Sequence, residues 1–500
     1  MKIAGLDIGT TGCKCTVFDE LGNYLAKTYR DYPVKRKVSG HEIDVTAVMD
    51  GVYACIREIA GQYPDIAGIG VTSFGETFVC VDAAGKPLHP AMLYTDPRGS
   101  KQCRTLVEKL GEKKIAKITG LRPHEMYSIS KMMWIKEELP EVYKKTKHIF
   151  LMEDYVVYHL TGVKQIDYSL ATRTMAFDIE KLTWSNEVFK TADIDVSLMA
   201  KPVPTGTSAG TITEKTAEQT GLRTDTVVVS VSHDQIAAAV GAGVFESAIA
   251  VDGAGTVECL TPVYDGIPDM DAMCQGYFSV VPYVIPGKYV AYAFSYTGGA
   301  LLQWCSDVLA KKEKELAEND GISVNEYLEK EYAKAFGEKP LSSILVLPHF
   351  AGAATPYMDT GSKGAVIGLT TDTSVAEIYR GCMEGVVYEM YLNMQAIKKA
   401  GITFQKLHAT GGGAHSAVWM QMKADVLNLP ITALKTVDAG TVGSAMLTGI
   451  VIGVFKNLQD AAVHMVEETI TYLPRPEMHE KYMRQFERYR RLYDAVRPLV

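Results

Sequence analysis

The sequence lacks three features that would place the protein in a special class. Its nine cysteines include no C-x-x-C pair, and their odd number and scattered positions argue against structural zinc and a disulfide framework. The longest apolar run, Val442 to Phe455, is shorter than the roughly 20 residues that span a bilayer. The N-terminal residues are too polar for a secretory signal. We therefore expect a protein of the reducing cytoplasm with no membrane partner.

An excess of positive charge is lacking as well. The chain has 51 Lys and Arg against 59 Asp and Glu, a formal net charge of -8, which argues against a nucleic-acid partner. Hydrophobic residues at 47% and charged residues at 22% are ordinary for a folded protein and exclude disorder, collagen and coiled coil. At roughly 150 residues per domain, the 500 residues predict two to four domains.

Two common nucleotide motifs are also missing. No G-x-x-x-x-G-K-[ST] occurs, and no glycine loop opens a helix as a dinucleotide fingerprint does. This exclusion concerns the two strand-flanked glycine loops, at Gly9 to Gly12 and Gly253 to Thr256, neither of which opens a helix. In the first, a Gly/Thr turn separates the predicted strands Ile3 to Ile8 and Cys13 to Asp19. Such a turn exposes backbone N–H groups that can cradle phosphate oxygens. The candidate phosphate ligands are Gly9, Thr10, Thr11 and Lys14, and Asp7 is the candidate Mg²⁺ ligand. Taken alone, the eight residues from Asp7 to Lys14 are explained equally well by an ordinary hairpin turn.

The second half of the chain repeats the pattern of the first. A strand from Ala248 to Asp252 leads into Gly253-Ala254-Gly255-Thr256 and a further strand. Two more segments, each with a Gly-rich or polar turn, recur in the same order in both halves, which predicts an internal duplication. We place the boundary near Gly241 to Glu246 and expect lobes 1–245 and 246–500, the second ending in a helix from Met478 to Val496. Gly255 and Thr256 would then form a second phosphate loop facing the first.

A third glycine turn follows the predicted strand that ends near Thr410. Gly411, Gly412, Gly413 and Ser416 precede a helix from Ala417 to Leu427. Glycines here would let the backbone approach a nucleotide near its adenosine and α-phosphate. The alternative is an ordinary strand-to-helix turn.

Asp234 is the candidate catalytic base. It follows the predicted strand Val227 to Val231 and begins a helix, where a carboxylate can take a proton from a substrate hydroxyl. The position alone favours a helix N-cap. His233 is an alternative base, although a histidine beside a helix start is more typical of a structural hydrogen bond.

The candidate sugar ligands lie at predicted strand ends. Polyol recognition needs groups that accept hydrogen bonds from adjacent hydroxyls, and we assign this role to Gly75, Glu76, Asp96, Arg98 and Asp234. From spacing alone, a surface Glu and an Asp-Pro turn explain the first four positions better.

The sequence resembles the FGGY family of carbohydrate kinases over nearly its whole length. Both phosphate loops resemble those of the family. Met126 to Glu138, with Lys131 and Trp134, resembles its first signature, and Gly364 to Leu369 with Arg380 to Gly385 resembles its second. The resemblance implies an α/β fold, ribonuclease-H-like and actin-like, duplicated into two lobes around ATP and a sugar. It also implies Asp234 as base, Gly411 to Ser416 at the adenosine, and a homodimer.

One segment bears on which sugar or polyol accepts the phosphate. Gly75-Glu76-Thr77 stands where xylulokinase-like members carry Met-His-Gly and glycerol kinases carry Arg-Glu-Thr, so the Glu is kept and the Arg is lacking. Tyr94 to Arg98 resembles a segment of ketopentose kinases. We expect an ATP- and Mg²⁺-dependent ketose or polyol kinase, with xylulose first and ribulose, glycerol, erythritol, gluconate or a deoxyketose as alternatives. A non-kinase actin-like ATPase is the second hypothesis.

Overall fold

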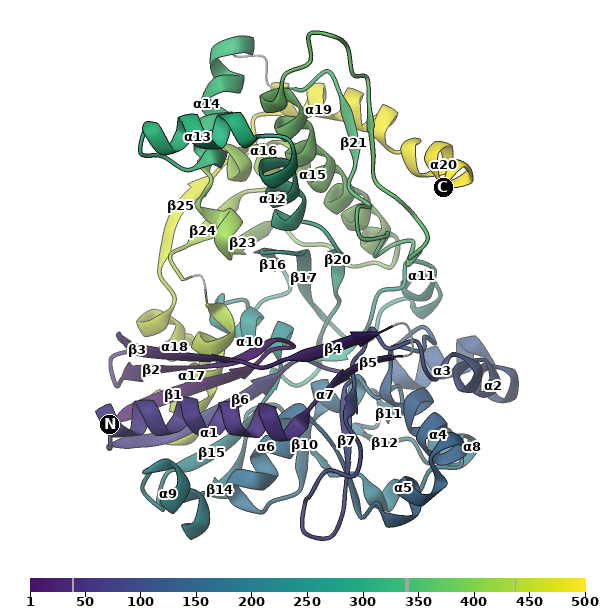
Figure 1. Cartoon of the computed structure of the whole chain (residues 1–500), viewed down its shortest axis with the longest axis vertical. Coiled ribbons are helices and arrows are strands. Elements are labelled where there is room, and N and C mark those ends of the chain that lie inside the picture. The colour runs from purple at the N-terminus through teal and green to yellow at the C-terminus, as the bar shows by residue number, and fades with distance from the viewer. Residues whose placement is uncertain (38–39, 338–340, 437) are drawn as a thin grey trace.

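The computed structural model describes residues 1–37, 40–337, 341–436 and 438–500. They form two main sheets, one above the other in Figure 1. The first sheet has the strand order β14-β15-β6-β1-β2-β3. Its strands are β1 (Lys2–Ile8), β2 (Gly12–Asp19), β3 (Tyr24–Asp31), β6 (Ile66–Ser73), β14 (Thr207–Thr211) and β15 (Val227–His233).

The second sheet repeats the first. Its central path runs β19-β17-β16-β23-β24-β25. In both sheets an antiparallel meander comes first, and two strands parallel to its first strand follow. The predicted duplication and the α/β fold class are thereby confirmed. The strands are β16 (Ile249–Ala254), β17 (Glu258–Asp265), β19 (Lys288–Val290), β23 (Lys406–Thr410), β24 (Ile431–Leu434) and β25 (Glu468–Tyr472).

Two helices rich in Ala and Gly join the lobes. Helix α10 (Asp234–Gly241) follows β15, and α17 (Ala439–Val451) follows β24 yet packs against β1 and β6 of the first sheet. An ideal Cβ at Gly443 would lie 1.9 Å from the carbonyl oxygen of Ala237, so only glycine allows this crossing of backbones. The second half of the chain therefore covers part of the first sheet, while the boundary at 245 stays a prediction.

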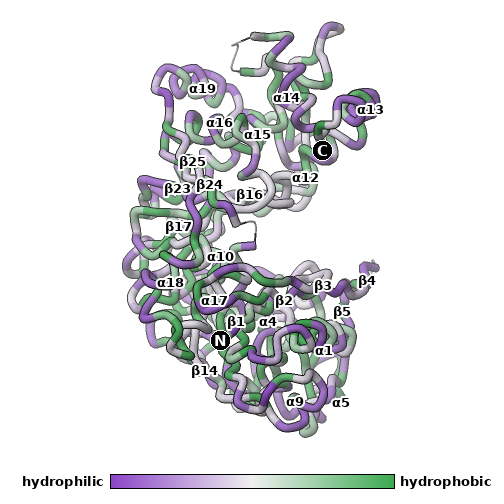
Figure 2. The backbone as a smooth tube through the Cα atoms, turned by 90° about the vertical axis from the view of Figure 1, so that its left-hand side faces the viewer, coloured by the Kyte–Doolittle hydropathy of each residue, from purple (hydrophilic) through white to green (hydrophobic). Residues whose placement is uncertain are grey.

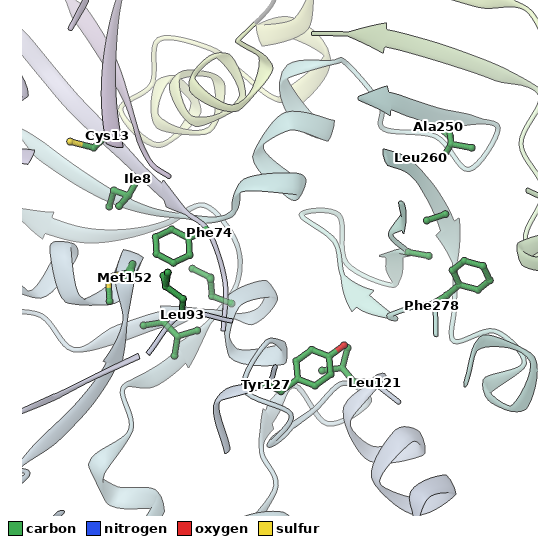
Figure 3. Packing of buried hydrophobic residues seen from close by; sticks show 14 of the residues in the cluster. Ile8, Cys13, Phe74, Leu93, Leu121, Tyr127, Met152, Ala250, Leu260 and Phe278 are labelled. Atoms are coloured by element: carbon green, nitrogen blue, oxygen red, sulfur yellow. The ribbon is translucent and has the colours of Figure 1, made fainter. Parts of the chain in front are cut away.

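Buried apolar residues form the interior of each lobe. In Figure 2, strongly hydrophilic segments of the backbone trace lie mostly at the periphery. The close view in Figure 3 shows Ile8, Phe74 and Met152 in the first lobe and Leu260 and Phe278 in the second. The central strand β1 is buried along most of its length, because helices cover both faces of the sheet. All nine cysteines are free thiols, and eight of them are buried as small apolar side chains.

The predicted helix from Ala417 to Leu427 is present as α16 (Ala417–Leu427), whereas the predicted terminal helix differs. The long α15 (Val375–Lys399) starts at an N-cap, Ser374, whose side chain accepts from the N–H of Glu377. The predicted terminal helix is two helices, α19 (Pro476–Tyr489) and α20 (Leu492–Val496). After the break, Tyr493 stacks on Tyr357 and donates to Asp359, contacts that the periodicity did not reveal. Within the described residues, none of the helices has the length and apolar character needed to cross a bilayer. The cytoplasmic location stays a prediction.

Candidate active site

The first phosphate loop is a tight turn between β1 and β2. The N–H of Gly9 donates to the carbonyl of Gly12 at 2.9 Å, and the Tyr32 hydroxyl donates to the carbonyl of Gly9 at 2.6 Å. These bonds hold the loop backbone in place. Thr11 at its tip is exposed, so its hydroxyl is open to a ligand.

Lys14 and Asp7 face each other across the hairpin. The Lys14 ammonium lies 3.0 Å from Asp7 Oδ2 and 2.9 Å from Asp438 Oδ1, so it is shared between two carboxylates. Burial raises the pKa of Asp7 to about 6, and the Lys14 ammonium opposes the shift. Asp438 appeared in the sequence only as part of a repeated turn. Its role at this loop depends on α17 packing against the first sheet.

Asp234 lies in the first turn of α10, and His233, the last residue of β15, occupies the N-cap position. Asp234 is therefore not the N-cap of α10, as its position in the sequence had suggested, but a residue of the first turn. Burial raises the pKa of Asp234 to about 6, while hydrogen bonding from Gln235 and the charges of Arg173 and Lys14 oppose the shift. Its Oδ1 is buried and has no hydrogen-bond partner among the described residues. Such a carboxylate is available to a ligand.

A magnesium ion fits Asp7 chemically. Asp7 lies in β1 directly before the first phosphate loop and offers hard carboxylate oxygens. Asp234 lies close enough for its charge to raise the pKa of Asp7. Mg²⁺ is usually held by one or two carboxylates together with water and phosphate oxygens. In the described part of the chain no set of three or more His, Cys, Asp or Glu forms a complete metal cage.

Glu76 is buried, and a guanidinium from another segment neutralises it. Arg173 Nε donates to Glu76 Oε1 at 2.6 Å, and Arg173 Nη2 forms an ion pair with the same oxygen. The Arg173 side chain lies between the rings of Tyr127 and Tyr292, at 5.2 and 5.5 Å from their centroids. Glu76 itself has a left-handed backbone with φ 64°. The surface-turn interpretation of Glu76 is therefore wrong.

Gly75 makes room for this pair. An ideal Cβ at Gly75 would lie 2.9 Å from Cγ of Arg173 and 3.1 Å from Cδ2 of His233. In this structure the guanidinium beside Glu76 comes from Arg173. Sequence reasoning missed Arg173, because its 97-residue separation from Glu76 leaves no local signal.

Asp96 and Arg98 are bonded to each other. The Asp96 carboxylate accepts from the backbone N–H, Nε and Nη2 of Arg98 and from the backbone N–H of His41. Arg98 also donates to Glu42 at 2.8 Å and lies 5.0 Å from the ring of Trp134. These contacts explain the segment structurally, and its role in sugar binding stays a prediction.

A cavity of about 710 Å³ opens on the second lobe. Gly255 and Thr256 of the second loop line it together with Gly412, Gly413 and Ser416, so these predicted residues do lie together. Gly411 is beside them, with φ 94° and an ideal Cβ only 2.7 Å from the carbonyl of Ala254.

The cavity also holds residues that the sequence did not suggest. Gln303, Asn325 and Glu329 line it, and the Ser416 hydroxyl donates to Glu329 Oε1 at 2.8 Å. Glu329 lies on α14 (Val324–Phe336), in a charge-dense stretch that is typical of a solvated helix. Only the packing of α14 beside the glycine loops reveals its position.

Lys131 of the first signature supports the fold. Its buried ammonium donates to the carbonyls of Glu125 and Met126 at 2.9 and 2.8 Å. Burial lowers its pKa to about 8. These bonds hold the turn before α4 (Ser128–Glu138), and that turn carries Tyr127 to the stack around Arg173.

Comparison with known proteins agrees with this arrangement. The N-terminal domain of the FGGY family of carbohydrate kinases matches residues 2–241, and its C-terminal domain matches residues 256–452. The chain belongs to the FGGY family of carbohydrate kinases. Its relatives include a xylulose kinase of Lactococcus lactis, 26% identical over 98% of this chain and 96% of that protein. A glycerol kinase of Halorhodospira halophila is 29% identical over 96% of this chain and 93% of that protein.

Solved structures show the same fold. A ligand-bound xylulose kinase from Lactobacillus acidophilus superposes with a TM-score of 0.88 at 21% identity, covering 99% of this chain and 98% of that chain. A Plasmodium falciparum glycerol kinase with ADP gives a TM-score of 0.86 at 20% identity, covering 99% of this chain and 98% of that chain. The predicted family and fold are confirmed, and the chain is a carbohydrate kinase.

Proposed function

We propose that this kinase transfers the γ-phosphate of ATP to a hydroxyl of a ketose or polyol, with xylulose as the first acceptor to test. The observation that carries the proposal is the half-buried Asp234 carboxylate, whose buried Oδ1 is unpartnered among the described residues, near Lys14 of the first phosphate loop and Arg173 of the buried ion pair. Relatives named for xylulose, glycerol and gluconate support this acceptor class.

The phosphates would be held from both lobes. Backbone N–H groups of Gly9 to Thr11 and the Lys14 ammonium would bind them from the first lobe, and Gly255 with Thr256 from the second. The adenosine would occupy the 710 Å³ cavity beside Gly411 to Ser416. Asp7 would hold Mg²⁺, which when bound neutralises phosphate charge.

Asp234 would take the proton of the acceptor hydroxyl. The hydroxyl oxygen then bonds to the γ-phosphorus, the bond from that phosphorus to the bridging oxygen breaks, and ADP leaves. A carboxylate with a pKa of about 6 is still ionised at neutral pH and holds a proton better than an ordinary aspartate. Burial thus prepares this residue for the base role.

Glu76 and Arg173 would recognise the rest of the acceptor. The carboxylate can accept from one hydroxyl, and the guanidinium can donate to an adjacent oxygen. Gly75 keeps the space that this pair needs. Asp96 and Arg98 are further predicted sugar ligands, and on the family resemblance we also propose a homodimer and a cytoplasmic location.

The test is ADP release with ATP and Mg²⁺ against ketopentoses, deoxyketoses, aldonates and polyols, with a control that contains no acceptor. We expect one acceptor to stimulate release far above the control. Asp234→Asn should lower the acceptor-stimulated rate of ADP release at least about 10²-fold while ATP still binds. Equal release in every reaction, the control included, would overturn the proposal.

A further inference from the structure

His233 lies between two groups that come from opposite lobes. Its Nδ1 is 3.2 Å from the Tyr292 hydroxyl, and its Nε2 is 3.3 Å from Asp234 Oδ1. The backbone N–H of His233 donates to the Ser169 hydroxyl at 2.9 Å, which anchors the end of β15. His233 and Asp234 belong to the first lobe. Tyr292 lies between β19 and β20 (Ala293–Ser295) of the second sheet.

Burial indicates where the protons of Tyr292 and His233 lie. Burial and the nearby Arg173 lower the pKa of His233 to about 3, so the imidazole is neutral and carries one N–H. Burial raises the pKa of the Tyr292 hydroxyl well above its usual value, so the hydroxyl keeps its proton. Tyr292 then donates to Nδ1, and the imidazole proton lies on Nε2, beside Asp234.

The carboxylate needs such a donor. Oδ1 of Asp234 is buried without a hydrogen-bond partner among the described residues, and an unpaired buried acceptor is costly. A small rotation of the His233 ring would align Nε2–H with Oδ1 across their 3.3 Å separation. The bond would hold one oxygen of Asp234 and leave the other for the acceptor hydroxyl.

We propose that His233 and Tyr292 are positioning residues that hold Asp234 in the orientation for proton transfer, and that Tyr292 couples this orientation to the seating of the second lobe against the first. The inference rests on the proposed role of Asp234 as base. It explains why a buried tyrosine hydroxyl of one lobe meets a buried histidine of the other. The reaction would then proceed efficiently only when both lobes are in place.

The charged surroundings determine the expected pH effect. Asp234 is influenced by Arg173, Lys14 and Asp7, and His233 by Arg173 and Glu76. A donor to the ionised carboxylate lowers its pKa, so removing the His233 N–H raises the pKa of Asp234. The acid limb of kcat/KM must therefore move to higher pH.

The experiment compares steady-state kinetics and pH profiles of four variants of the full-length kinase. Tyr292→Phe should lower kcat about 10-fold with little change in the KM for ATP. His233→Leu should shift the acid limb upward by about 0.5 to 1 pH unit, and His233→Gln, which keeps a donor near Nε2, should restore its position. Tyr283→Phe is the matched control, because this buried hydroxyl donates only to the carbonyl of Val244.

Coupling between the two positions separates positioning from mere packing. The double variant Tyr292→Phe with His233→Leu should be no slower than His233→Leu alone, because Tyr292 acts through His233. Additive losses, an unmoved acid limb, or a Tyr292→Phe enzyme equal to the Tyr283→Phe control would each overturn the inference. If His233→Leu does not fold, the comparison of Tyr292→Phe with Tyr283→Phe still tests the inference. Retained turnover in Asp234→Asn would instead refute the base assignment itself.

Discussion

Removing Arg173 should destabilise the kinase more than removing both members of its ion pair. The Glu76 and Arg173 side chains are only 5% and 7% exposed, so Arg173→Met leaves a buried carboxylate without its cation. Breaking a buried pair from one side costs about 3–5 kcal/mol, whereas replacing both charges is often nearly neutral. At about 2–4 °C per kcal/mol, the single variant should melt about 10 °C lower.

The assay is thermal unfolding of Arg173→Met, Glu76→Gln and the double variant, followed by acceptor kinetics of each. The double variant should recover most of the melting temperature lost in Arg173→Met. All three should raise the KM for the acceptor more than the KM for ATP, because neither member of the pair lines the 710 Å³ cavity proposed for the nucleotide. A single variant that melts within 2 °C of the unmodified protein, or losses that simply add, would refute the reasoning about the pair.

Three further predictions test other parts of the structure. Activity should fall as pH drops through about 6, because burial raises the pKa of Asp234 to about 6 and protonation removes the base; a pH profile flat down to pH 5 would contradict this. Gly443→Ala should destabilise the junction by at least about 1–3 kcal/mol, since its Cβ would lie 1.9 Å from the Ala237 oxygen, whereas Gly61→Ala, with open space around its Cβ, should be tolerated in the same melting assay. Glu329→Gln should raise the KM for ATP by about 3- to 10-fold with little change for the acceptor, since the net worth of one hydrogen bond is about 0.5–1.5 kcal/mol; an unchanged ATP KM would contradict nucleotide binding in the cavity that Glu329 lines.

Features that depend on neighbouring residues were predictable. Turn residues and short apolar runs predicted three local units. These are the strand–turn–strand around Gly9 to Gly12, its repeat at Gly253 to Thr256, and the glycine turn at Gly411 to Gly413. The recurrence of these units predicted two lobes of the same topology. The place of Asp234 at the head of a helix followed from the strand before it and the Ala-rich segment after it.

The environment of those residues was decided by the tertiary structure. Spacing alone favoured a surface turn for Glu76 over a sugar site, because its partner Arg173 and the nearby ring of Tyr292 come from distant segments. Helix α17, which crosses from the second half of the chain to the first sheet, brings Asp438 to Lys14 in the same way. Local sequence determines backbone conformation through short-range sterics and hydrogen bonds. Burial, ion pairing and raised pKa values arise only when segments far apart in the chain exclude water together.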